Sequence, residues 1–335
     1  MKVLVIRFSS IGDIVLTTPV MRCIKKQIPD AELHFLTKRS MKTVTEENPY
    51  IDKFFYYDKN LSELKQQLKQ EQYDYVIDLH KNFRSYMIRW SLKAKTLSYK
   101  KLSIEKFLLT KFHINRMPGR HITMRNLDAV ANLGVKDDGE GLDYFIGEKD
   151  ILPEESIPLT HRFGFIAIVI GASYYTKKLP VASLIDLCKH LNFPIILVGG
   201  KEDFPEGKAI AEKVPVKVFN ACGMFNLNQS ADIVRRSRLV ISHDTGLQYI
   251  ACAFNKPVLA IWGGTSPKLD VEPFYGTKTI NNEEENFTYK NFVVDGLNCQ
   301  PCSNYGTKKC PKGHFKCMLN QDIDEIIATA YSILR

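Results

Sequence analysis

An aspartate follows the first predicted strand, at the point where a nucleotide-binding turn would hold a phosphate. The strand spans residues 2–7, the chain breaks at residues 9–12, and Asp13 stands where a helix over residues 14–21 should begin. Phosphate cradles use glycines, backbone N–H groups and often a lysine, whereas a carboxylate repels the anion. Asp13 is therefore either a plain helix N-cap or a base that takes the proton of a hydroxyl group.

A second polar junction lies between a predicted buried strand over residues 239–242 and a predicted helix over residues 247–254. Asp244, Thr245 and Gly246 fall in this junction. Aspartate or threonine can cap the helix, and glycine lets a ligand approach the backbone closely. The free N–H groups could bind a pyrophosphate, provided that Asp244 turns away to a ribose or to backbone donors. A helix cap without a ligand is the alternative.

Two further loops follow predicted strands in the second half. The first carries Ser173, Thr176 and Lys177, and its lysine could neutralise the charge that builds on a departing phosphate. The second follows Gly199–Gly200 and carries Glu202, a carboxylate that could accept hydrogen bonds from ribose hydroxyls. Each loop taken alone is equally typical of solvated surface.

The elements that must position these residues alternate between apolar strands and helices. Continuous apolar runs without period-two alternation are typical of strands that are buried on both faces of a parallel sheet. The predicted strands span residues 33–36, 54–57, 73–79, 163–170, 194–198, 216–219 and 257–261, besides the two above. Predicted helices span residues 180–191 and 226–238, and a final helix over residues 322–334 should pack onto a domain without carrying chemistry.

This pattern predicts an α/β fold with two doubly wound, Rossmann-like halves facing across a cleft. A chain of 335 residues exceeds what one core usually supports. The turn-rich stretch 147–160 reads as a linker, which places the domains at residues 1–155 and 156–335. Ligands are then expected at the carboxyl ends of the strands.

Basic charge is concentrated in one stretch of the first half. Residues 81–125 hold twelve lysines and arginines and one acid, Glu105, so this stretch has a charge of +11. Because the net charge of the whole chain is +9, the remaining residues sum to −2. Aromatic side chains are interleaved with it, so the stretch could touch an anionic membrane surface, nucleic acid or only solvent. The first residues do not resemble a signal peptide, and no apolar run is long enough to span a bilayer. We expect a cytoplasmic protein or one on the inner membrane surface.

Four of the eight cysteines are grouped near the end of the chain. They are Cys299, Cys302, Cys310 and Cys317, with His314 as a possible substitute ligand. A CxxC pair with two further ligands in a loop is compatible with structural zinc. Reduced thiols or one disulfide are the alternatives, because the second pair lacks the usual close spacing.

Three of these segments together resemble glycosyltransferase family 9, which contains the ADP-heptose:lipopolysaccharide heptosyltransferases. They are residues 7–19 with Asp13, residues 171–180 with Lys177, and residues 243–246 followed by 256–258. The resemblance spans nearly the whole chain and keeps the order of the motifs. It implies a GT-B fold, with an acceptor domain followed by a nucleotide-sugar domain, and inversion at the anomeric carbon without an obligatory metal.

The resemblance also implies roles for individual residues. Asp13 matches the general base, Lys177 the lysine at the diphosphate, and Asp244, Thr245 and Gly246 the donor-binding turn. Glu202 is a looser match, because the spacing would also permit Asp203 or Glu206. The family commonly has histidine at the place of Tyr249, so the donor contacts and the sugar could differ here. The remaining expected contacts are Ser173 and Thr176 for the donor and Ser9, Ser10, Gly12, Lys81, Arg84 and Arg120 for the acceptor.

We therefore expect an inverting enzyme that moves heptose from ADP-heptose to a phosphorylated, lipid-linked lipopolysaccharide core precursor at the inner membrane face. No cofactor is expected in catalysis, and membrane is preferred to nucleic acid as the partner of the basic stretch. Two alternatives remain: transfer of another nucleotide-activated sugar to a surface glycan, and a noncatalytic nucleotide-binding protein that docks on membrane or nucleic acid.

Overall fold

The computed structural model describes residues 1–278 and 289–334 and divides the chain into two compact units. The first unit contains Met1–Lys101, Arg120–Phe145 and residues 276–278. The second contains Leu102–Gly119, Ile146–Tyr275 and the described residues from Tyr289 onward. The division expected at residue 155 stays a prediction of the domain boundary.

The first unit is a five-stranded parallel sheet in the order β3-β2-β1-β4-β5. Its strands are β1 (Lys2–Ile6), β2 (Glu32–Lys38), β3 (Lys53–Tyr57), β4 (Tyr75–Asp78) and β5 (Lys95–Ser98). Its helices are α1 (Ile11–Val15), α2 (Thr18–Gln27), α3 (Lys42–Thr45), α4 (Leu61–Gln70), α5 (Phe83–Ser91) and α7 (Ile122–Asp128). Leu64, Leu68 and Ile88 of α4 and α5 pack on one face of the sheet, against Leu4 and Ile6 among others.

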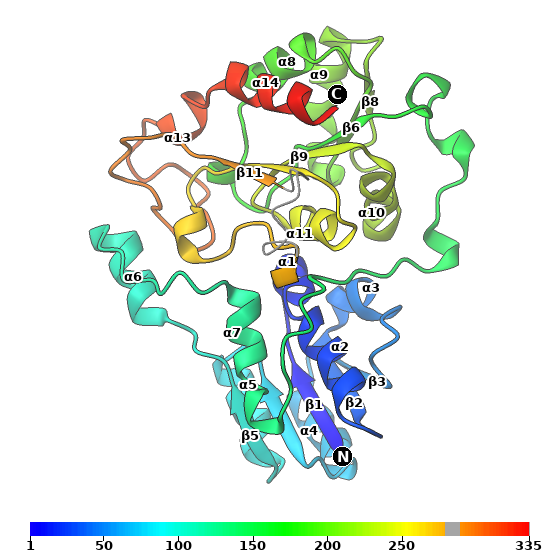
Figure 1. The fold of residues 1–335 in the computed structure, drawn as a ribbon, viewed down its shortest axis with the longest axis vertical. Helices are drawn as coiled ribbons and strands as arrows, with labels where there is room; N and C mark the ends of the chain where they lie inside the picture. The colour runs from blue at the N-terminus through cyan, green and yellow to red at the C-terminus, as the bar shows by residue number, and fades with distance from the viewer. Residues whose placement is uncertain (279–288, 335) are drawn as a thin grey trace. The chain divides into compact units, whose positions relative to one another are not determined.

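The second unit is a six-stranded parallel sheet in the order β11-β10-β9-β6-β7-β8. Its strands are β6 (Ile166–Val169), β7 (Ile195–Val198), β8 (Val218–Asn220), β9 (Leu239–His243), β10 (Val258–Ile261) and β11 (Tyr289–Phe292). Its helices are α6 (Ser103–Phe112), α8 (Val181–His190), α9 (Phe204–Lys213), α10 (Leu227–Arg236), α11 (Gly246–Ala253), α13 (Lys316–Leu319) and α14 (Ile323–Leu334). Helices α8, α9 and α14 cover one face of the sheet, and α10 and α11 cover the other (Figure 1).

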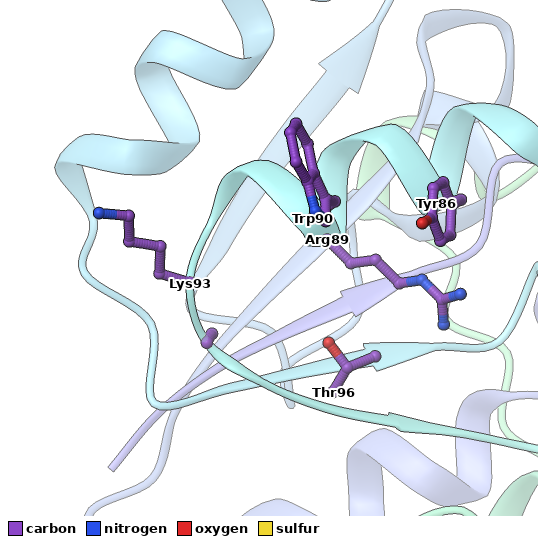
Figure 2. A pocket seen from close by; sticks show the side chains of 6 residues that line it. Tyr86, Arg89, Trp90, Lys93 and Thr96 are labelled. Atoms are coloured by element: carbon purple, nitrogen blue, oxygen red, sulfur yellow. The ribbon is translucent and has the colours of Figure 1, made fainter.

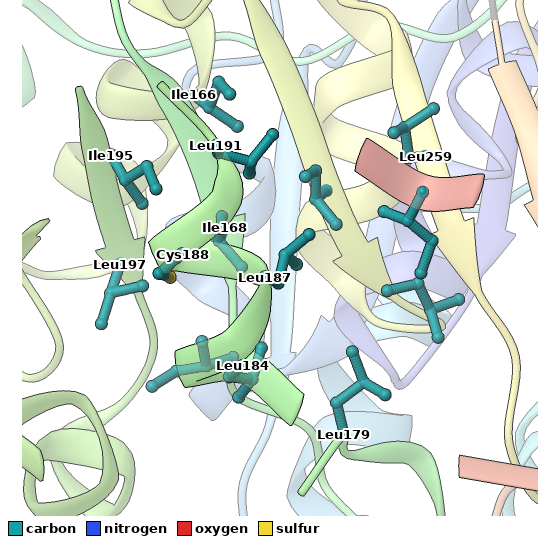
Figure 3. Close-up of a cluster of buried hydrophobic side chains, with 14 of the residues drawn as sticks. Ile166, Ile168, Leu179, Leu184, Leu187, Cys188, Leu191, Ile195, Leu197 and Leu259 are labelled. Atoms are coloured by element: carbon teal, nitrogen blue, oxygen red, sulfur yellow. The ribbon is translucent and has the colours of Figure 1, made fainter. Parts of the chain in front are cut away.

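The core of the second unit explains why its strands were predictable. Ile166, Ile168, Ile195 and Leu197 point from β6 and β7 toward Leu187 of α8 (Figure 3). These strands are buried along their whole length, so they read as continuous apolar runs. The final helix α14 packs against α8 through Ile326 and Ala330, as expected from its apolar stripe.

The helix predicted over residues 14–21 is wrong. The chain forms α1, breaks after Val15, and starts again as α2 with Thr17 as N-cap and Pro19 in the first turn. Proline cannot donate a backbone hydrogen bond, so a single helix cannot run through this point. Asp13 consequently lies in the third position of α1 and is not its N-cap, which is Ser10.

Strands β5 and β11 were not predicted. Both are outer strands, and their sequences Lys95–Ser98 and Tyr289–Phe292 are polar or only half-buried. An edge strand has one neighbour and need not carry an apolar run. Among the described helices, none has both the length and the apolar character that crossing a bilayer requires.

Candidate active site

The carboxyl ends of the central strands hold the candidate residues in both units. In each sheet the strand order reverses beside the first strand of the unit, between β1 and β4 and between β6 and β9. Loops that leave the sheet at such a reversal diverge to opposite faces, which leaves room for a ligand. Asp13 follows β1, whereas Lys177 and Asp244 follow β6 and β9.

In the first unit, Asp13 is held by two neighbours in its own loop. Its Oδ1 forms an ion pair with Nη2 of Arg7 at 2.6 Å. Its Oδ2 accepts hydrogen bonds from the backbone N–H of Ser10 at 3.0 Å and from the Ser10 hydroxyl at 2.8 Å. Arg7 also donates to the carbonyl oxygens of Ser9 and Leu79. The Asp13 side chain remains 37% exposed, so an acceptor hydroxyl can reach it.

The protonation of Asp13 follows from these contacts. Burial alone would raise its pKa, but the Arg7 guanidinium and the two Ser10 donors outweigh burial and lower it. Asp13 is therefore a carboxylate throughout the neutral range, as a proton acceptor must be.

Replacing Arg7 by glutamine should raise the pKa of Asp13 and move the acid limb of the kcat/KM profile to higher pH. Wild-type Asp13, with its lowered pKa, also contributes stability that is present above the unfolded pKa and lost as the pH falls. R7Q should therefore lower the melting temperature more at pH 7 than at pH 3. The kcat/KM profile and the melting temperature of wild type and R7Q are measured over a pH series, with R39Q, a change at an exposed arginine, as the control. If the acid limb of R7Q does not move, Arg7 does not set the pKa of Asp13.

Three groups that the sequence analysis did not single out lie around Asp13. Arg7 pairs with it directly, and His80 and Lys101 lie close enough that their pKa values respond to Arg7 and to Asp13. Burial, aided by Arg7, lowers the pKa of His80 to about 4, and burial and Arg7 also lower that of Lys101. Lys101 donates to the carbonyl oxygen of Lys81 at 2.8 Å. The cations gathered near Asp13 suit an acidic acceptor.

The other expected acceptor residues are placed less centrally. Lys81 donates to the Tyr99 carbonyl oxygen at 3.1 Å, and the Arg84 guanidinium lies 5.7 Å from the centre of the Tyr57 ring. Gly12 is buried within α1. Arg120 makes an ion pair with Asp128 at 2.6 Å, so its charge is already neutralised within the first unit.

In the second unit, Lys177 and Asp244 form an ion pair at 2.7 Å, although 67 residues separate them in the sequence. Asp244 Oδ2 also accepts a hydrogen bond from the Thr265 hydroxyl at 2.8 Å. The structure thus joins the loops after β6, β9 and β10 at one point. Asp244 is turned toward Lys177 and Thr265, so the start of α11 keeps its own donors.

Three buried polar groups without partners surround this helix start. They are the Thr245 hydroxyl, both amide atoms of Gln248, and Nδ1 of His243, with partners counted among the described residues. His243 Nε2 accepts from the Leu179 N–H at 2.9 Å, so the proton of the neutral ring is on Nδ1. Burial and then Lys178 and Lys177 lower the His243 pKa to about 3. Buried polar groups normally have partners, so this cluster is suited to a polar ligand.

Lys177 is fixed by the segment that carries the cysteines. Thr176 and Thr307 are joined by several hydrogen bonds. Thr176 donates its N–H and hydroxyl to the Thr307 carbonyl at 3.2 and 3.1 Å, and Thr307 N–H donates to the Thr176 hydroxyl at 2.8 Å. Gly306 packs so closely on Lys177 that an added Cβ would lie 2.9 Å from its Cγ. The rings of Tyr175 and Phe315 stack at 4.7 Å.

The cysteines themselves are gathered but do not form a compact ligand set. Burial, together with the neighbouring thiols of Cys302, Cys310 and Cys299, raises the pKa of Cys317 to about 12. Cys299 Sγ lies 3.6 Å from His314 Nε2. Among the described residues, the group whose metal-binding atoms all lie within 4.8 Å is instead Glu32, His34 and Glu71. That group is neutralised by Lys2 and Lys53, which pair with Glu71. Zinc at the cysteines stays a prediction.

The remaining expected donor residues differ in what they offer. The two alternatives to Glu202 are occupied, because Lys178 pairs with Asp203 at 2.9 Å and with Glu206 at 2.5 Å. Glu202 makes no ion pair in the described part of the chain and keeps its carboxylate for a ligand. Tyr249 is buried, and its hydroxyl donates to the Val271 carbonyl at 2.6 Å. Its hydroxyl proton is thus committed to the protein.

The comparisons with known proteins concern the family and the fold. The family model of glycosyltransferase family 9 (heptosyltransferase) matches residues 61–296, a range that includes Lys177 and Asp244 but not Asp13. The sequence is 24% identical to lipopolysaccharide heptosyltransferase 1 of Campylobacter coli over 292 residues, which cover 79% of this chain and 84% of the relative.

Two solved structures resemble nearly the whole chain. Escherichia coli ADP-heptose lipopolysaccharide heptosyltransferase II superposes with a TM-score of 0.72 at 16% identity, covering 100% of this chain and 98% of the other. A glycosyltransferase family 9 protein of Veillonella parvula gives 0.76 at 21% identity, with 99% and 97% covered. These likenesses confirm the predicted GT-B fold.

Proposed function

The chain belongs to glycosyltransferase family 9, the heptosyltransferase family, and from this premise we propose that it transfers heptose from ADP-heptose to a lipopolysaccharide core precursor. The enzyme class, a glycosyltransferase that uses a nucleotide sugar, follows from the family itself. The observation that carries the donor assignment is the contact of Lys177 with Asp244 at the strand reversal of the second unit. The named substrates rest on what similar proteins act on.

In the proposed reaction, the donor diphosphate binds at the start of α11. Thr245 is the N-cap, and its hydroxyl makes no hydrogen bond with the described residues, so the first N–H groups of the helix remain for phosphate oxygens. Lys177 transfers its pairing from Asp244 to the diphosphate. Asp244 then accepts hydrogen bonds from Thr265 and from ribose or backbone donors, and Ser173 and Glu202 complete the donor contacts. The expected contact of Thr176 is not included, because its hydroxyl is buried and bonded to Thr307.

The transfer step is a single displacement with inversion. The acceptor hydroxyl attacks the anomeric carbon opposite the diphosphate, the carbon–oxygen bond to the diphosphate breaks, and the bonding electron pair leaves with ADP. Asp13 takes the hydroxyl proton, while Lys177 and the helix amides stabilise the charge on the leaving diphosphate. These groups supply the positive charge that a divalent cation would otherwise provide, so we place no metal in this step.

The acceptor is proposed to be anionic because Arg7 pairs with Asp13 and two lysines lie in the loops after the neighbouring strands. Arg7, Lys81 and Lys101 belong to the loops after β1, β4 and β5, which end at the same edge of the first sheet. Ser9 and Ser10 lie in the loop after β1 and would contact a phosphorylated saccharide. Such a lipid-linked acceptor would bring the enzyme to the inner face of the cytoplasmic membrane.

A panel of nucleotide sugars tests the donor. ADP-heptose at 100 times its dissociation constant should stabilise the protein by roughly 2.7 kcal/mol, and UDP- and GDP-sugars should have much smaller effects. Transfer is then followed with phosphorylated and dephosphorylated core precursors, and only the phosphorylated form should be used efficiently. If another nucleotide sugar stabilises the protein more than ADP-heptose does, the second candidate is favoured, a glycosyltransferase with a different donor. The observation behind that candidate is Tyr249, which stands where the family commonly has histidine.

A further inference from the structure

Helix α5 carries an aromatic stripe that the fold leaves uncovered. Phe83, Tyr86 and Trp90 follow one another at the spacing i, i+3, i+7, which places them on one side of a helix. Phe83 is 77% exposed and Trp90 74% exposed, whereas Ser85 and Ile88 on the opposite side are buried against the sheet. A helix that only covers a sheet usually has polar side chains on its solvent-facing side, whereas this side of α5 carries aromatic rings.

Basic residues flank the stripe. At 100° per residue, Arg84 and Arg89 fall on the two sides of the aromatic row, and Lys93 follows two residues after the end of the helix. The chain from Leu79 to Ile104 contains seven lysines and arginines and no acid. Arg89 also lies 5.0 Å from the centre of the Tyr86 ring. This surface is therefore both apolar and cationic.

A hollow of about 380 Å³ opens beside the stripe. Figure 2 shows Tyr86, Arg89 and Trp90 along α5, Lys93 just beyond its end, and Thr96 on the neighbouring strand β5. The lining thus joins two cations and a hydroxyl to two aromatic rings. Its volume is in the range of small-molecule sites, and its chemistry fits a phosphate ester with a short polar headgroup.

We propose that the α5 surface, defined as Phe83, Tyr86, Arg89, Trp90 and Lys93, docks this enzyme on an anionic lipid bilayer, and that the hollow takes a lipid phosphate headgroup. The choice of a bilayer is set by the combination of exposed Trp and Phe with the positive charge of Lys93, which makes no ion pair with the described residues, and of Arg89, whose contact with Asp78 spans 4.0 Å. Aromatic rings prefer the headgroup level, and basic residues are attracted to anionic lipids. Double-stranded nucleic acid would need only the charge, and single-stranded nucleic acid, which also stacks on aromatic rings, is compared directly in the test below. The proposal rests on the proposed function, since a lipid-linked acceptor is presented at a bilayer.

Vesicle co-sedimentation of the full chain tests the docking. Wild type should bind phosphatidylcholine vesicles that contain phosphatidylglycerol, bind pure phosphatidylcholine weakly, and lose binding as salt rises. F83A/W90A should weaken binding about ten-fold or more, because two exposed rings no longer enter the interface. K93Q should weaken it about five-fold and flatten the salt dependence.

Matched controls separate this surface from general charge and stickiness. F163A removes a ring that is 85% exposed in the second unit, and K59Q/K69Q removes two exposed lysines of the first unit; both should bind vesicles like wild type. Equal losses in the controls, undiminished binding of F83A/W90A, or tighter binding to single-stranded nucleic acid than to the anionic vesicles would overturn the proposal.

Activity with two forms of the acceptor distinguishes this proposal from the proposed function. F83A/W90A should keep wild-type turnover with a water-soluble, delipidated acceptor and lose activity only with acceptor embedded in vesicles. If wild type transfers no heptose to either acceptor while vesicle binding behaves as expected, the proposed function fails and the docking surface stands. If both acceptors are used equally well by F83A/W90A, the docking surface fails and the proposed function stands.

Discussion

Replacing Asp13 by asparagine should lower kcat by about 10²–10⁴-fold, the range that a positioned general base contributes. Asparagine keeps the shape of the side chain and an oxygen that can accept the hydrogen bonds from Ser10. It cannot accept the hydroxyl proton. Donor affinity should change little, because the donor assignment lies in the second unit at Lys177 and Asp244.

Initial rates with saturating donor and acceptor measure the effect of D13N, and calorimetry with ADP-heptose measures donor binding. D58N is the matched control, since Asp58 is an exposed carboxylate whose contact with Arg39 spans 3.8 Å. A melting temperature close to wild type would show that the unpaired Arg7 has not unfolded the loop. Turnover of D13N near the wild-type value would remove Asp13 as the base.

Replacing Lys177 by glutamine should lower kcat/KM by about 10²–10³-fold, the usual cost of losing one group that stabilises developing charge. Lys177 is largely buried beside Asp244, so its charge acts in a site where water screens little. The loss should appear in kcat as well as in donor KM, because the diphosphate gains negative charge as the sugar bond breaks. K177R should recover part of the rate.

Lys178 provides the matched comparison, because it has the same charge at the adjacent position. Its ammonium group is shared between Asp203 and Glu206. K178Q should therefore lower the melting temperature by leaving buried Asp203 without its cation, with a smaller effect on kcat than K177Q. A K177Q enzyme that retains wild-type kcat would assign the leaving-group role to the helix amides alone.

The local chemistry of the strands and loops was readable from the sequence because it depends on neighbours in the chain. Buried parallel strands such as Ile166–Val169 and Ile195–Val198 need apolar side chains on both faces, so they stand out as continuous runs. Once the strands were predicted, Asp13, Lys177 and Asp244 could be assigned to the loops at the ends of these strands. The failures were local too: Pro19 divides the helix expected over residues 14–21, and the outer strands β5 and β11 carry too few apolar residues to be recognised.

By itself, then, the sequence determined the α/β architecture, the loops that hold the candidate residues, and the resemblance that led to the family. Only the tertiary structure decided which charges meet. In the folded chain Lys177 pairs with Asp244, and Arg7 pairs with Asp13. Lys178 pairs with both Asp203 and Glu206. Phe83 and Trp90 of α5 remain exposed. Ion pairing and burial act over a few ångströms in space between residues far apart in the chain, so no spacing in the sequence could have revealed them.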